Sequence, residues 1–106
     1  MLAIQDAATG RSLEQEFHEL ASQWKLETAH LSRMDKIVLH PAYLKIIGMG
    51  REALPWILRE LERHVDYWFT ALEAITRTSL IERDQPLTMS EATAAWIDWG
   101  KRHGYC

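Results

Sequence analysis

The sequence predicts an all-α protein, a single compact bundle of five to six helices. Apolar residues recur at steps of three and four, and no segment sustains the period-two alternation of a strand. Helix-breaking residues, Pro41, Gly50 and Pro55 among them, stand where one apolar run gives way to the next. The 106 residues are 47% hydrophobic and 25% charged, which is the composition of an ordinary globular domain.

Charge and cysteine content narrow the function classes. The net charge of −3 argues against a direct electrostatic grip on nucleic acid. A lone Cys106 forms no internal disulfide and no cysteine-based metal site, which fits a reducing cytoplasm. The sequence shows no signal peptide, and no apolar run approaches the roughly 20 residues of a membrane span. We therefore expect a cytoplasmic protein with no membrane association, no metal and no cofactor.

The first predicted helix begins after a flexible tail of residues 1–11 and opens a single helical domain over residues 12–104. Ser12 and Gln15 have the spacing of a capping box, in which each side chain satisfies a free backbone N–H of the other residue. The buried stripe of this helix is predicted to comprise Leu13, Phe17, Leu20 and Trp24.

Two short helices are predicted next. Ser32 with Asp35 forms a second N-cap pair, opening a helix that continues to Leu39. Pro41 disfavours helical geometry at the residue before it, and it suits the first position of the following helix, residues 41–47. Because that helix is apolar on nearly every side, we expect it to be buried.

The centre of the chain carries the strongest amphipathic pattern. Gly48 and Gly50 allow the chain to reverse, and a helix is predicted over residues 51–64 with Pro55 in its first turns. Trp56 falls on the face opposite the leucines. The predicted apolar stripe is Leu54, Leu58, Leu61 and Val65, and the residues that share the face of Trp56 are Glu52, Arg59, Glu60 and Arg63.

Two helices complete the predicted bundle. Asp66 is expected to cap a helix over residues 67–77, and residues 78–87 read as a loop. Thr88 and Glu91 form another capping box ahead of a final helix over residues 89–101. Gly100 and Gly104 are expected to weaken its end and to leave Tyr105 and Cys106 as a short tail.

The central stretch resembles a HEAT-like helical hairpin. The order of its segments also resembles that of small bacterial proteins, a likeness that carries no activity over to this chain. The HEAT-like resemblance implies two antiparallel helices at the centre of the bundle and a role in binding other proteins. The residues that carry it are Ile47-Gly48, Ala53-Leu54-Pro55, Leu58, Ala71-Leu72 and Ile75.

One pair of residues has the spacing of a catalytic motif. Arg59 and His64 match the R-x4-H pattern of HEPN-type ribonucleases, in which His64 would carry a proton and Arg59 would hold a phosphate. The competing interpretation is an exposed helix end, where His64 complements the helix dipole. No two histidines have HxxxH spacing, so the sequence predicts no metal site.

Trp56 is the strongest candidate for a binding role, because tryptophan is enriched among interface hot spots. The alternative is that the first or last helix folds back over Trp56 and buries it. The favoured hypothesis is a small helical interaction module, a subunit or regulator of a larger bacterial enzyme or toxin, with a homo-oligomer left open. A HEPN-like ribonuclease and a nucleic-acid-binding accessory protein are the alternatives. The predicted partner-binding residues are Trp56, Glu52, Arg59, Glu60 and Arg63.

Overall fold

All regular secondary structure in the computed structural model is helical over the residues that it describes, 12–80 and 87–106. The predicted all-α bundle is confirmed. The predicted tail of residues 1–11 and most of the predicted loop of residues 78–87 lie outside the described ranges. Within those ranges, no helix combines the length and the apolar character needed to cross a membrane.

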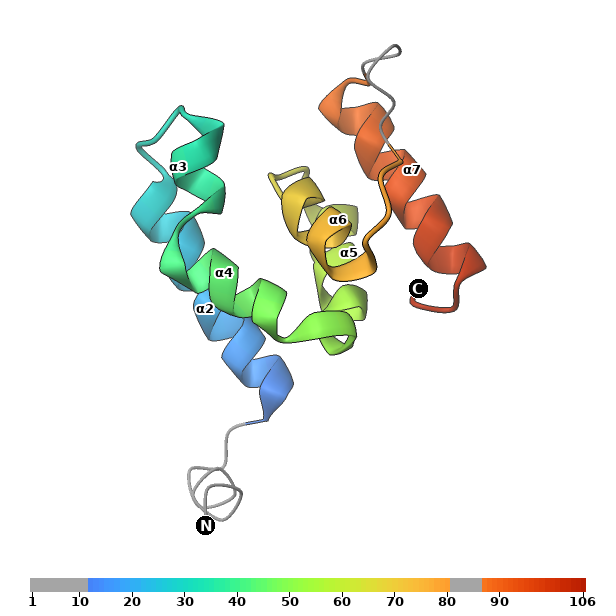
Figure 1. Cartoon of the computed structure of the whole chain (residues 1–106), viewed down its shortest axis with the longest axis horizontal. Helices are drawn as coiled ribbons and strands as arrows, with labels where there is room; N and C mark the ends of the chain where they lie inside the picture. Colours follow the sequence, from blue (N-terminus) through green and yellow to red (C-terminus); the bar gives the residue numbers. More distant parts are fainter. Residues whose placement is uncertain (1–11, 81–86) are drawn as a thin grey trace.

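The helices form a layered arrangement (Figure 1). α5 and α6 lie in the middle, with α2, α3 and α4 on one side and α7 on the other. α4 contacts both α2 and α6, and α7 packs mainly on α5. The helices are α2 (Leu13–Thr28), α3 (Met34–Val38), α4 (Pro41–Gly48), the 3-10 helix η1 (Gly50–Ala53), α5 (Leu54–Arg63), α6 (Phe69–Thr76) and α7 (Met89–Arg102).

Both predicted capping boxes are present. At the start of α2, the Gln15 N–H donates to Ser12 Oγ at 3.1 Å and the Ser12 N–H donates to Gln15 Oε1 at 2.8 Å. Thr88 and Glu91 make the same reciprocal pair at the start of α7, at 3.1 and 2.9 Å. These local signals fix where the two longest helices begin.

The predicted cap at Ser32 is wrong. α3 begins one residue later, after Arg33, whose guanidinium binds the Asp35 carboxylate and leaves that side chain unable to complete a capping pair. Pro41 does open α4 as predicted, and the His40 ring accepts the Ala42 N–H at 3.1 Å.

α4 is buried on one side only, which corrects the expectation of burial all round. Ala42, Tyr43 and Ile46 face the core, whereas Leu44 is 47% exposed. α4 lies at the edge of the bundle, against α2, α6 and η1, so its outward side meets solvent.

The chain reverses at Gly50, which has a φ of +73°, whereas Gly48 stays within α4. α5 is shorter than predicted: it begins at Leu54, after η1, and ends at Arg63. His64 takes an extended backbone with φ −148°, so Val65 leaves the apolar stripe and is 48% exposed. Its assignment to the buried stripe is wrong.

The start of α6 is capped from another helix. α6 begins at Phe69, two residues later than predicted, and the Asp66 carboxylate accepts the Tyr67 N–H rather than capping the helix. The Tyr43 hydroxyl on α4 accepts the Ala71 N–H at 2.8 Å and donates to the Tyr67 carbonyl at 2.9 Å. A side chain 28 residues away therefore satisfies a backbone group in the first turn of α6.

Four aromatic side chains form the centre of the core. Trp24 and Trp68 have ring centroids 4.7 Å apart, and each also contacts the ring of Tyr43. Phe17 adjoins Trp68 at 5.8 Å. The Trp24 indole N–H donates to the Ile37 carbonyl at 2.8 Å and so ties α2 to α3. The aliphatic side chains of α5 complete the core: Leu54, Ile57, Leu58 and Leu61.

The last residues are folded onto α7, not free. Gly104 has a φ of +81°, and the Gly104 and Tyr105 N–H groups donate to the Lys101 and Gly100 carbonyls in a Schellman motif. The Tyr105 ring stacks on Trp99 with centroids 5.6 Å apart. Gly100 is buried against Leu58, so it packs α7 closely onto α5 and does not weaken the helix end.

Candidate functional site

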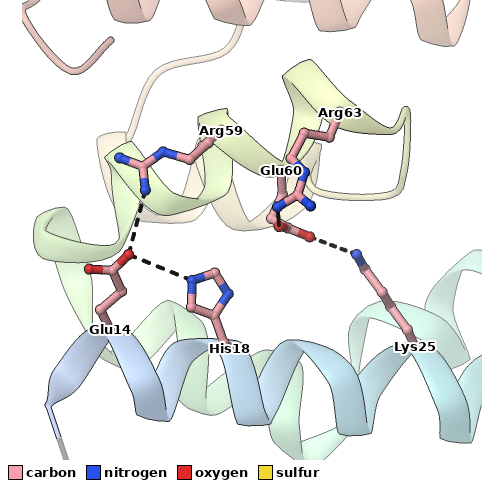
Figure 2. A network of polar contacts seen from close by, with 6 residues as sticks. All are labelled: Glu14, His18, Lys25, Arg59, Glu60 and Arg63. Carbon is pink, nitrogen blue, oxygen red and sulfur yellow. Dashed lines mark hydrogen bonds and ion pairs between the residues drawn. The ribbon is translucent and has the colours of Figure 1, made fainter.

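The predicted partner-binding face of α5 looks toward α2 (Figure 2). Arg59, Glu60 and Arg63 project from α5 toward side chains of the first helix. Glu52 precedes them in η1 and is exposed, as are Arg59 and Arg63, whereas the Glu60 side chain is only 13% exposed. Two of these charged side chains, Arg59 and Glu60, form ion pairs with α2.

The first group of contacts centres on Glu14 of α2. Its carboxylate lies 3.5 Å from the Arg59 guanidinium and 3.6 Å from the His18 ring. All three side chains are about half exposed, so water screens their attraction. Contacts of this kind orient side chains and add little to the stability of the fold.

The second group centres on Glu60 and is more enclosed. Lys25 of α2 donates to Glu60 Oε1 at 2.7 Å, and Arg63 lies 3.7 Å from Oε2. Burial by itself would raise the pKa of Glu60, but the bond to Lys25 and the nearby positive charges outweigh it and hold the pKa below its ordinary value. This pair joins the last turn of α2 to α5.

Trp56 packs against the edge of the core. Its ring contacts Phe17 of α2 with centroids 5.8 Å apart, and the side chain is half-buried. α2 therefore packs against part of Trp56, so the structure lies between the two alternatives that the sequence left open, an exposed ring and a ring covered by the first helix. The residue as a whole is only partly buried, and its role in partner binding remains a prediction.

The two residues of the R-x4-H motif lie in different local structures. Arg59 is within α5 with its guanidinium directed at Glu14, and His64 is an exposed residue past the end of the helix. Catalysis would require both side chains to reach one phosphate. The ribonuclease hypothesis stays a prediction.

Charged groups elsewhere in the described ranges do not assemble into a metal site. Over residues 12–80 and 87–106, no three His, Cys, Asp or Glu side chains come close enough to hold a metal ion. Several cations are engaged in ion pairs with neighbouring carboxylates: Lys25, Arg33, Arg59, Arg63 and Arg102.

A groove between α2 and α4 is the feature that sequence reasoning missed. It is open to solvent and has a volume of about 630 Å³. Leu13 and Leu20 do not belong to the buried stripe that the sequence predicts, because Leu13 is exposed and Leu20 is half-buried at the groove. The groove is lined by Leu13, Glu16, Leu20, Lys45, Gly48 and Met49.

Comparison with known proteins adds no relative. No family model, curated protein or solved structure matches the chain. The HEAT-like resemblance of the central hairpin therefore stays a prediction.

Proposed function

We propose that the chain is a small helical protein–protein interaction module, a subunit or regulator that docks onto a larger protein. The observation that carries the proposal is Trp56, a large aromatic side chain that α2 covers only in part. Exposed charges surround its position along the chain: Glu52 comes one turn before it, and Arg59 and Arg63 follow one and two turns after it.

A half-covered tryptophan with a charged border has the properties of an interface anchor. Burying the rest of the indole against a partner gains apolar area at little entropic cost, because the side chain has only two rotatable bonds and Phe17 already restrains it. The charges at the border favour one orientation of the partner more than they add affinity. A larger bacterial enzyme or toxin is the class of partner that we propose.

The proposal is tested by comparing what tagged variants capture from extracts of the source cell. Arg63→Glu reverses a charge at the border of Trp56, and Arg102→Glu is its matched control on α7. The two arginine side chains are 66% and 64% exposed, and each pairs with a carboxylate on its own helix. We expect one protein to be retained by the wild type and the control and reduced roughly tenfold by Arg63→Glu.

A second variant, Trp56→Ala, tests the contribution of the tryptophan ring itself. Because the ring rests on Phe17, we expect this variant to lose about 2 kcal/mol of folding stability as well as the partner, whereas Arg63→Glu stays within about 0.5 kcal/mol of the wild type. Identical capture by the wild type, Arg63→Glu and Trp56→Ala would refute the proposal. Cleavage of RNA that both Arg59→Ala and His64→Ala abolish would favour the ribonuclease instead.

A further inference from the structure

We propose that a cavity between α3 and α6 binds a small quaternary or alkylated ammonium group. The cavity is partly open to solvent and has a volume of about 260 Å³. Sites for drug-sized ligands span about 300–1,000 Å³, so this one suits a single functional group rather than an extended molecule. It shares no residue with the predicted face of Trp56 on η1 and α5. The cavity is lined by Met34, Tyr67, Phe69, Thr70 and Glu73.

Two aromatic side chains reach the cavity from the turn that leads into α6. Trp68, the N-cap residue of α6, is fully buried in the aromatic core. Tyr67 and Phe69 stand on either side of it in the chain and are only partly buried. Over residues 12–80 and 87–106, neither of these two rings contacts another aromatic ring. Both therefore line the cavity without an aromatic partner, and an aromatic ring attracts a cation over its face.

A carboxylate lies beside these rings without a cation of its own. Glu73 is one turn after Phe69 on α6 and is half-buried, and its Oε2 accepts the Ser79 hydroxyl at 3.3 Å. In the part of the chain that the structure describes, no lysine, arginine or histidine forms an ion pair with it. Met34, the first residue of α3, is 46% exposed and adds a polarisable thioether to the lining.

The surrounding charges favour a positive ligand. Burial raises the pKa of the Tyr43 phenol, and the negative charges of Asp66 and Glu73 raise it further. No basic residue lines the cavity. An anion would meet these two carboxylates, and a neutral apolar group would leave Glu73 without a counter-charge.

The apolar lining selects among cations. A bare ammonium is strongly hydrated and would have to give up its water to enter. Alkyl groups on the nitrogen spread the same charge over an apolar surface that matches aromatic rings and a thioether. A quaternary or alkylated ammonium group therefore satisfies both the rings and the carboxylate.

Titration of the full chain with choline chloride, followed by the amide signals in NMR spectra, tests the proposal. Its control is the neutral isostere of choline, in which a carbon atom replaces the nitrogen, so that the shape is kept and the charge is lost. Sodium chloride at equal concentration corrects for ionic strength. We expect choline to shift the signals of residues 67–73 with a dissociation constant on the order of millimolar, and the isostere to bind roughly tenfold more weakly.

Substitutions separate the charge from the cavity. Glu73→Gln keeps the size of the side chain and should weaken choline binding roughly tenfold while the affinity for the isostere is unchanged. Glu62→Gln is the matched control, because Glu62 is an exposed carboxylate on α5 outside the cavity, and it should bind choline like the wild type. Phe69→Leu, with its fold checked by circular dichroism, keeps an apolar side chain without a ring and should weaken choline binding about fivefold.

Three results would each overturn the proposal: no choline-dependent shift in the wild type, equal affinity for choline and its isostere, or equal choline affinity in the wild type and Glu73→Gln. A short peptide that contains trimethylated lysine identifies the source of the ammonium group, with the unmethylated peptide as its control. If the methylated peptide binds more tightly than choline, the ligand is a modified side chain of another protein. If it binds no more tightly, the ligand is a free small molecule, and the ammonium chemistry holds in both cases.

Discussion

Replacing Tyr43 by Phe removes a single oxygen atom and tests how α6 is held. That oxygen accepts the Ala71 N–H at 2.8 Å and donates to the Tyr67 carbonyl at 2.9 Å, and Tyr43 is fully buried. α6 has no capping side chain of its own, because the side chain at its N-cap position, Trp68, makes no capping bond. Without the hydroxyl, one N–H and one carbonyl lose their partner inside the protein.

The cost follows from the two bonds. Each hydrogen bond contributes about 1 kcal/mol net, and a buried group left without a partner costs about 1–3 kcal/mol. Water that reaches the end of α6 offsets part of this loss, so we expect Tyr43→Phe to lower the free energy of unfolding by about 2 kcal/mol. For a chain of this size, that corresponds to a fall of about 10 °C in the melting temperature.

Urea unfolding followed by circular dichroism measures the effect, with Tyr67→Phe as the control, because only the Tyr67 backbone enters this network. If Tyr43→Phe lowers the free energy of unfolding by less than about 0.5 kcal/mol, the Tyr43 hydroxyl does not cap α6 as argued.

The pH dependence of unfolding gives a second measurement. Burial raises the pKa of the Tyr43 phenol far above its ordinary value. Its contribution to stability is therefore present below about pH 10 and is lost as the pH rises further, a loss that the Phe variant should lack.

Two further substitutions test the contacts between helices. Gly100→Ala should destabilise the protein by about 1–2 kcal/mol in thermal unfolding, because the added Cβ would lie 2.5 Å from Leu58 Cδ1, and overpacking there exceeds the gain in helix propensity. Gly48→Ala is the control, because the space at Gly48 is open, and it should leave the melting temperature unchanged or raise it. A lower melting temperature for Gly48→Ala than for Gly100→Ala would contradict the close packing of Gly100 on Leu58. Lys25→Met should cost about 1 kcal/mol at neutral pH. Because the pKa of Glu60 is lowered in the folded protein, the stability that this pair contributes is present above about pH 4.3 and is lost as the pH falls. On acidification, Lys25→Met should therefore lose less folding stability than the wild type.

The sequence predicted the helices best where a signal acts within a few residues. The boxes at Ser12 and Thr88, and Pro41 at the start of α4, place helix starts correctly because the groups they satisfy are neighbours in the chain. Ser32 does not cap α3, and the Asp35 carboxylate binds the Arg33 guanidinium instead. Residue spacing alone does not show which of the two interactions Asp35 makes.

The faces of the helices were harder to predict, because periodicity shows that a helix has an apolar side but not what covers it. Leu13 and Phe17 share one stripe, yet Phe17 is buried beneath α5 and α6 while Leu13 lies at the groove. The charges beside Trp56 were predicted from periodicity alone, but the engagement of Arg59 by Glu14 and of Glu60 by Lys25 depends on how α2 crosses α5. The Tyr43 cap depends in the same way on a contact between distant segments.

The attachment of α7 has a consequence for cooperativity. α7 packs on the other helices mainly through α5, and the rings of Trp96, Trp99 and Tyr105 contact one another rather than the aromatic core around Trp24. Trp96 and Trp99 do belong to the same apolar cluster as the other helices, but because α7 is attached mainly through one neighbour we expect it to open locally at a lower free energy than α5. Amide hydrogens in α7 should therefore exchange with solvent faster than those of α5, and binding at the surface of α7 would slow that exchange without any change in the fold.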